Sequence, residues 1–327
     1  MAQDIEPGPD QRVVDWLLGT DPAIRWQVLR DLVDAREAEW RGERERVETE
    51  GWGAELLSYQ DADGQWAGGA FIPGGFSWER FRNEGQPWTA TCWALTELRD
   101  LGLDPGSEAA RRTVRLIGEN SRWNHDGQPY WEGEVEECIN GRTVAQGAYF
   151  GVDVAPIVER LLSEQMADGG WNCERERGSV RSSFDSTLNV LEGLLEYEQA
   201  APGDDRIAGA RAAGEEYLLE RRLMYRLSSG ELVDPEHLQP VYPPRWQYTV
   251  VRALDYFRAA ARHAGAAPDP RLHDAVEALR AKRREDGTWA VERRHRGAAW
   301  ISYGEVGEPS PWLTLQALRI LGWWEVG

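Results

Sequence analysis

The residues best suited to acid–base chemistry are clustered glutamates near the middle of the chain. Glu134, Glu136 and Glu137 stand within four positions of one another. Carboxylates this close can raise each other's pKa, which keeps one proton available for transfer to a substrate. We therefore treat Glu134 and Glu136 as candidate catalytic residues. The alternative interpretation is an acidic loop that only contacts solvent.

Two cysteines and an aspartate close to these glutamates form a candidate metal site. Cys138 follows the glutamates directly, Cys173 lies further along, and Asp185 stands near the start of a later apolar segment. Thiolates and carboxylates can make a tetrahedral zinc site, so Cys138, Cys173 and Asp185 are the predicted ligands. Asp185 is also a candidate to act in catalysis with Glu134 and Glu136. The competing interpretation is that the cysteines are small buried apolar groups.

Basic side chains form a third group of candidates. Arg142, Arg181 and Arg245 each stand just before a segment that we expect to be an apolar helix. Arginine binds phosphate through two parallel hydrogen bonds, and helix N-termini favour anions. These three residues are therefore candidates to hold a diphosphate. Alternatively, they pair with nearby glutamates in an ion network.

Aromatic residues recur near the starts of the same apolar segments. Their faces could line a central cavity, where they would stabilise cationic intermediates or stack on a flat or isoprenoid ligand. In the alternative interpretation they fill the centre and leave no cavity. The candidates for substrate contact are Trp26, Trp88, Trp131, Phe184, Trp246 and Trp312.

The chain that must position these residues has a helical pattern throughout, with no convincing alternating strand. Two kinds of helix alternate along it. One kind is apolar on most sides, which is typical of buried helices, and is predicted at 23–33, 88–101, 143–150, 184–197, 246–257 and 312–323. The other kind is charged with one apolar face and is predicted at 11–18, 37–57, 108–119, 154–164, 207–223 and 271–283. Six of each is the number needed for a closed barrel of inner and outer helices, which predicts a single all-α domain over residues 1–327.

The connections between these helices also alternate. Links from an inner to an outer helix are short and carry proline, whereas links from an outer to an inner helix are long and rich in glycine and tryptophan, as at 64–87 and 287–311. In a barrel of alternating helices all the long links fall at one end, together with the N-termini of the inner helices. Long loops in compact domains are usually functional, so we expect the active face at that end.

Composition narrows the function classes and the compartment. The 327 residues carry a formal net charge of −19, which argues against a nucleic-acid partner, because such binding needs lysine and arginine to neutralise phosphates. Three cysteines do not make a disulfide framework and favour a reducing, cytoplasmic location. The sequence has no apolar run long enough for a transmembrane helix, and its start does not have the pattern of a signal peptide.

One short pattern occurs three times: the end of a helix, an Asp-Gly turn and then a tryptophan. The copies end at Trp66, Trp171 and Trp289, and the first two also carry Gln60 and Gln165. Self-similarity of this kind indicates a repeat architecture. The element resembles the repeat named for its Gln and Trp in squalene and oxidosqualene cyclases, and related repeats build the β subunits of protein prenyltransferases.

The resemblance to this superfamily implies an α6/α6 toroid that holds an isoprenoid substrate in a central aromatic cavity. The cyclase motif Asp-x-Asp-Asp, which protonates an alkene or epoxide, is missing, and residues 134–137 are the nearest acidic counterpart. The zinc ligands of the prenyltransferases resemble an Asp-x-Cys before one inner helix and a His near the start of a later one. Here Glu136 stands in the place of the Asp, and Asp185 in the place of the His.

Three functions are consistent with these observations. The first is a terpene cyclase or prenyltransferase-like enzyme that acts on an isoprenoid or other apolar ligand, with zinc as its cofactor. The second is a carbohydrate-active α/α toroid that uses a carboxylate pair such as Glu136 and Asp185, whose separation would distinguish retaining from inverting chemistry. The third is a binding module that kept the toroid without the chemistry. No protein partner can be inferred.

Overall fold

The structure is a computed structural model, and it describes residues 10–326. Over this range the chain is helical, and its only extended pairing consists of isolated β-bridges. None of the helices in this range is long and apolar enough to cross a membrane. The α-helices are α1 (Gln11–Leu18), α2 (Pro22–Asp31), α3 (Glu37–Glu45), α4 (Gly51–Ser58), α5 (Trp78–Glu84), α6 (Thr91–Leu101), α7 (Glu108–Asn120), α8 (Glu137–Phe150), α9 (Ala155–Ser163), α10 (Phe184–Ala200), α11 (Asp205–Leu219), α12 (Val250–Ala264), α13 (His273–Arg280) and α14 (Pro311–Val326).

Many of these helices begin where a side chain can accept a hydrogen bond from a free backbone N–H. Such an N-cap satisfies one of the donors that the first turn leaves without an intrahelical partner. The capping residues include Asp21 before α2, Ser107 before α7, Ser183 before α10, Asp204 before α11 and Thr249 before α12. The local sequence therefore fixes these helix starts independently of the packing.

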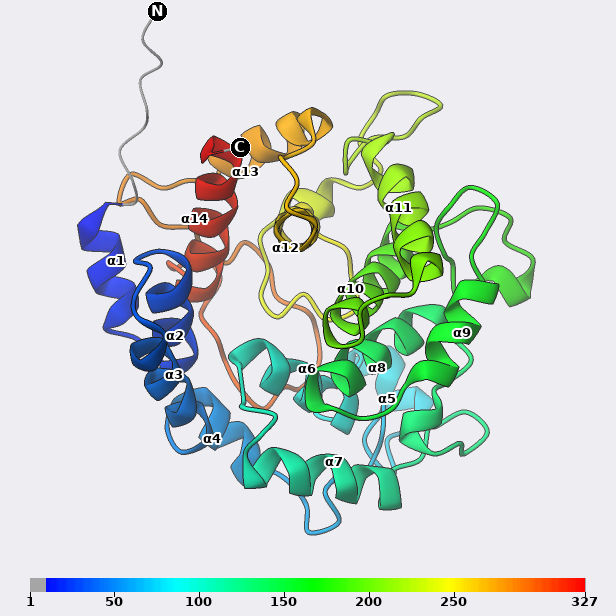
Figure 1. Ribbon diagram of the computed structural model, residues 1–327. Coiled ribbons are helices and arrows are strands. Elements are labelled where there is room, and N and C mark those ends of the chain that lie inside the picture. The colour runs from blue at the N-terminus through cyan, green and yellow to red at the C-terminus, as the bar shows by residue number, and fades with distance from the viewer. Residues whose placement is uncertain (1–9, 327) are drawn as a thin grey trace, which may run out of the picture.

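The helices predicted to be buried pack against one another in succession (Figure 1). Helix α6 packs against α8, α8 against α10, α10 against α12, α12 against α14, and α14 against α2. Helices α2 and α6 are joined by the Trp26 indole, whose Nε1 donates to the carbonyl of Leu101 at 2.9 Å. Each charged helix packs on a neighbouring buried one, as α7 and α9 do on α8, α11 on α10 and α13 on α12.

The three tryptophan repeats form the same joint each time. The indole Nε1 atoms of Trp66, Trp171 and Trp289 donate to carbonyls ten residues earlier, at the ends of α4, α9 and α13, over 2.8–2.9 Å. Their backbone N–H groups donate to the threonines Thr91, Thr187 and Thr314 in the first turns of α6, α10 and α14. Each unit therefore ties the end of a charged helix to the start of the next buried helix.

Several helix boundaries differ from the sequence-based prediction. Helix α8 begins at Glu137, six residues before the predicted start at 143, whereas α6 and α12 begin three and four residues after theirs. The single helix predicted at 37–57 is divided into α3 and α4, and α4 begins at Gly51, whose φ is +64°. Glycine is required at this position, because a Cβ there would lie 2.0 Å from the Asp21 carboxylate. Helix α5 lies within a segment predicted to be only a long link.

Candidate functional site

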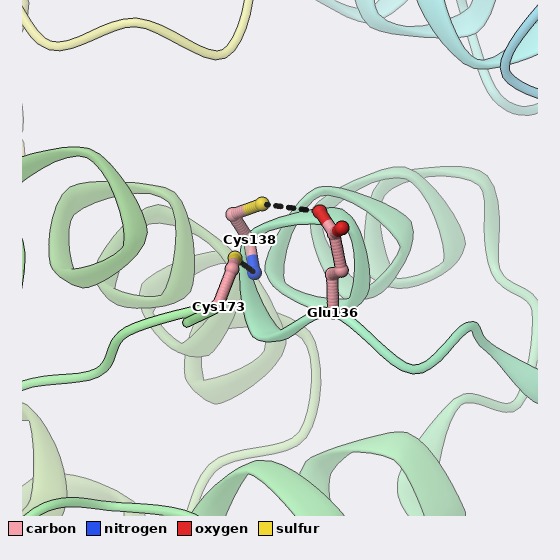
Figure 2. A group of neighbouring side chains, drawn as sticks. All are labelled: Glu136, Cys138 and Cys173. Carbon is pink, nitrogen blue, oxygen red and sulfur yellow. Dashed lines mark hydrogen bonds between the residues drawn. The ribbon is translucent and has the colours of Figure 1, made fainter. Parts of the chain in front are cut away.

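Glu136, Cys138 and Cys173 come together at the start of α8 (Figure 2). One carboxylate oxygen and the two Sγ atoms lie within 4.8 Å of one another, and all three side chains are half-buried. Glu136 is the N-cap residue of α8, Cys138 lies in its first turn, and Cys173 lies in the link between α9 and α10. The packing of α10 on α8 thus unites residues separated by 35 positions.

Hydrogen bonds hold the two sulfur atoms in place. The backbone N–H of Cys138 donates to Cys173 Sγ at 3.3 Å, and the Cys138 thiol donates to Glu136 at 3.7 Å. Ser186, in the first turn of α10, fixes the other cysteine: its Oγ accepts from the Cys173 N–H at 3.2 Å and donates to Cys173 Sγ at 3.3 Å. The group is therefore anchored on two helices.

Burial and neighbouring acidic groups raise the pKa of two members of this group. The adjacent Cys173 thiol and then burial raise the pKa of Cys138 well above its usual range. Burial, followed by the charge of Glu134, raises the pKa of Glu136. A divalent metal ion stabilises the deprotonated forms of thiols and carboxyl groups, because thiolate and carboxylate are its ligands. Two sulfurs and one carboxylate oxygen are a donor set that suits zinc and leave one of four tetrahedral positions open.

The other two acidic candidates have different roles. Asp185 does not belong to this three-residue group: its Oδ1 accepts a hydrogen bond from the backbone N–H of Tyr248 at 2.6 Å. The prediction of Asp185 as a third metal ligand therefore has no geometric support, because the side chain is turned to the segment before α12. Glu134 is buried, and its Oε2 accepts from the backbone N–H of Glu136 at 2.8 Å. It orients the segment that carries Glu136.

A cavity of about 250 Å³ lies among the buried helices, and its lining is charged rather than predominantly aromatic. Six arginines and five carboxylates face it, with Trp93, Tyr242, Tyr256 and Trp312 as the aromatic members. The charged residues are Arg99, Arg142, Arg245, Arg252, Arg258 and Arg319, together with Glu97, Asp100, Glu192, Glu196 and Asp255. A second cavity of about 310 Å³ shares Tyr242, Pro243 and Arg245 with the first and is also lined by Trp88, His295 and Trp300.

The predicted substrate-contacting residues are divided by the structure. Arg142, Arg245 and Trp312 line the central cavity, and Trp88 lines the second one. Arg245 forms a buried ion pair with Glu97, which is not one of the glutamates expected to pair with the predicted arginines.

The remaining candidates lie outside both cavities. Arg181 is exposed, and Trp26 is buried, with its indole Nε1 donating to the carbonyl of Leu101. Phe184 packs against Tyr217 and Tyr248, and Trp131 donates to the carbonyl of Val114. The three aromatic side chains join helices rather than line a cavity. Trp246 belongs with Phe71 to a separate aromatic cluster built on Trp88 and Trp93.

Sequence reasoning missed most of the charged lining of the central cavity. Glu97, Arg99 and Asp100 lie within α6, and Glu192 and Glu196 within α10, both predicted as largely apolar helices. The available signal was the spacing: Glu192 and Glu196 are four apart and share one helix face. Charges on one face of an otherwise apolar helix indicate a polar interior.

Comparison with known proteins adds no assignment. No protein-family model matches the chain, and no curated protein sequence matches it. Function is therefore inferred below from the side chains and their arrangement.

Proposed function

We propose that the chain is an α6/α6 toroid of the terpene cyclase and protein prenyltransferase type. The alternation of buried and charged helices supports this, as does the packing of α14 against α2 that would complete an inner circle. The three equivalent tryptophan joints are further support, because each makes the same pair of hydrogen bonds. In this proposal α3 and α4 together occupy one outer position.

We propose further that Glu136, Cys138 and Cys173 hold a zinc ion and that the chain is a zinc-dependent enzyme. The observation that carries this proposal is the convergence of the three ligand atoms within 4.8 Å at a half-buried position. Bound zinc supplies Lewis acidity and a free coordination position for an oxygen or sulfur atom of the substrate or for water. Glu134 would keep the Glu136 ligand oriented, and Ser186 would do the same for Cys173.

The substrate in this proposal carries an apolar portion, such as an isoprenoid. The separate aromatic cluster supports this choice, because Trp88 and Trp93 pack with the half-buried Phe71 and Trp246. The Trp93 ring also lies 5.3 Å from the guanidinium of Arg142, and Arg142 is on the same helix as Cys138, one turn further along. An apolar group would lie on this cluster, since the charged central cavity offers it no favourable surface.

The carbohydrate-active alternative receives less support. It requires Glu136 and Asp185 to act on one substrate as a pair of carboxylates. Instead, the Glu136 carboxylate accepts from a thiol and Asp185 accepts from a backbone N–H. A binding module without catalysis is distinguished from the enzyme only by measurement.

Metal analysis tests the zinc proposal directly. Purified protein dialysed against zinc should retain about one ion per chain, and cobalt substitution should give a thiolate-to-cobalt absorption band. Both signals should be lost in Cys138→Ser and in Cys173→Ser. Cys92→Ala is the matched control, because Cys92 is fully buried elsewhere on α6 and should leave both signals intact. Equal metal content in all four proteins would refute the assignment.

Substrate class is tested separately on the zinc-loaded protein. Farnesyl and geranylgeranyl diphosphate should bind, whereas an oligosaccharide of similar length should not. We expect Trp246→Ala to weaken prenyl binding by about tenfold, because it removes one apolar face of the cluster. Binding of the oligosaccharide alone would overturn the choice of substrate but not the zinc site.

A further inference from the structure

Arg142 differs from every other arginine of the central cavity. The five others each lie within 4.0 Å of a carboxylate: Arg99 pairs with Asp100, Arg245 with Glu97, Arg252 with Glu192, Arg258 with Asp255, and Arg319 with Asp255. Within residues 10–326, no carboxylate lies within that distance of Arg142. Its guanidinium donates to neutral acceptors instead, namely Asn189 Oδ1 at 2.7 Å, the Arg245 carbonyl at 2.5 Å and Thr96 Oγ1 at 3.3 Å.

This unpaired guanidinium is deeply buried. Arg142 is 7% exposed, and its side chain lies against the Trp93 ring. Burial, followed by the charge of Arg252, lowers the pKa of Arg142 to about 10, so it stays charged at neutral pH. A buried charge without a counter-ion is unfavourable unless a ligand supplies one. The lining as a whole also has one more arginine than it has carboxylates, in a chain whose net charge is −19.

Two other polar groups of the same cavity wall lack a hydrogen-bond partner. The Tyr242 hydroxyl and the Trp312 Nε1 are buried and have no hydrogen-bond partner among the residues that the structure describes. Their rings stack on each other at 4.1 Å, so the two side chains form one rigid wall of the cavity. Neither polar atom is exposed to the cavity, so the two rings shape its wall without offering a hydrogen bond to a ligand there.

From these observations we infer that the central cavity binds a small molecule bearing a single carboxylate group, which pairs with Arg142. The cavity of about 250 Å³ adjoins the second cavity through Tyr242, Pro243 and Arg245, and its charged lining suits a polar ligand rather than a prenyl chain. One surplus positive charge matches a monoanion better than a doubly charged phosphate. The site does not depend on the proposed zinc ion, because Arg142, Tyr242 and Trp312 are not among its ligands.

Paired probes of equal shape test this inference. Benzoate and acetate are compared with their neutral amides, benzamide and acetamide, and with inorganic phosphate, by calorimetry and thermal shift in a buffer free of other carboxylates. We expect at least one carboxylate to bind and to raise Tm, and its amide to bind at least about tenfold more weakly. Tighter binding of phosphate than of either carboxylate, or equal binding of acid and amide, would overturn the inference.

Variants separate this site from a general effect of charge. Arg142→Met should weaken carboxylate binding by about 10- to 100-fold. Arg181→Met is the matched control, because Arg181 is exposed and outside the cavity. Cys138→Ser should lose metal and keep carboxylate binding, so the two proposals can fail independently. Undiminished binding by a folded Arg142→Met protein would contradict the assignment.

Discussion

At the scale of single residues, the three cysteines lie in different environments. Cys92 is fully buried in α6, where burial raises the pKa of its thiol and leaves it a packing residue. Cys138 and Cys173 are half-buried beside Glu136 and form a group that could hold an ion. The sequence nominated Cys138 and Cys173 together with Asp185, but it could not show which acidic side chain would lie beside the two cysteines. The choice depends on α10 packing against α8, which no local pattern encodes.

His295 makes the stability of the protein depend on pH. Burial, followed by the charges of Arg293 and Arg245, lowers the pKa of His295 from 6.5 to about 3. Between these values the unfolded chain binds a proton that the folded chain does not, so the free energy of unfolding falls as the pH falls through this interval. The expected slope from this residue is at most about 1.4 kcal/mol per pH unit.

Urea unfolding at pH 7 and pH 5 measures this effect. The His295→Gln variant should lose less stability between the two pH values than the parent protein does. His125→Gln, at an exposed position, controls for the loss of an imidazole. Equal losses in the parent and in His295→Gln would show that His295 is not responsible.

At the scale of elements, the tryptophan repeat was the strongest predictor of structure. The three copies predicted equivalent units, and the structure gives each the same two hydrogen bonds. Helix type was also predictable, because apolar and charged segments alternate. Helix boundaries were less predictable. Trp88 and Trp246 were expected to begin helices, yet they lie in the links before α6 and α12. Their rings pack with Phe71 and Trp93, so tertiary contacts rather than helix propensity determine their place.

The threonine that receives each tryptophan should be as important as the tryptophan itself. Thr187 is fully buried, and its Oγ1 accepts the backbone N–H of Trp171 at 3.1 Å. Thr187→Val keeps the shape and leaves that N–H without a partner, which should lower the free energy of unfolding by about 1–3 kcal/mol. Chemical denaturation measures the change. Thr49→Val, at an exposed position, should change it by no more than about 0.5 kcal/mol, and a similar loss in both variants would contradict the role of the joint.

At the scale of the whole molecule, the all-helical class was confirmed over the described residues, but the charged interior was not anticipated. The physical reason is that several of the buried charges pair with helices distant in sequence. Arg252 on α12 reaches Glu192 on α10, and Arg245 reaches Glu97 on α6. When each helix is considered alone, these charged residues look like exceptions on an apolar face. The closed toroid itself stays a prediction.

Arg319 connects three of the buried helices, and its loss should destabilise all of them together. From α14 it pairs with Asp255 on α12, donates to Gln27 on α2 at 3.0 Å, and lies 3.7 Å from Asp31. Arg319→Met should lower the free energy of unfolding by about 2–4 kcal/mol, because buried carboxylates lose a partner. Hydrogen exchange should accelerate in α2 and α12 as well as in α14.

A matched variant on the outside of the molecule gives the comparison. Arg280 pairs with Glu277 and Glu325 at partly exposed positions, so Arg280→Met should cost no more than about 1 kcal/mol. Exchange confined to α14 in the Arg319→Met protein would mean that the three helices do not share one cooperative unit.

The contact between Arg319 and Gln27 joins positions 292 residues apart. While the chain is being synthesised, Gln27 leaves the ribosome long before Arg319 does, so the α2 surface that α14 will cover stays open for most of translation. Contacts between distant positions form late and slow folding. The nascent protein should therefore bind chaperones through α2 until α14 emerges, and a pause in translation just before residue 311 should prolong that association.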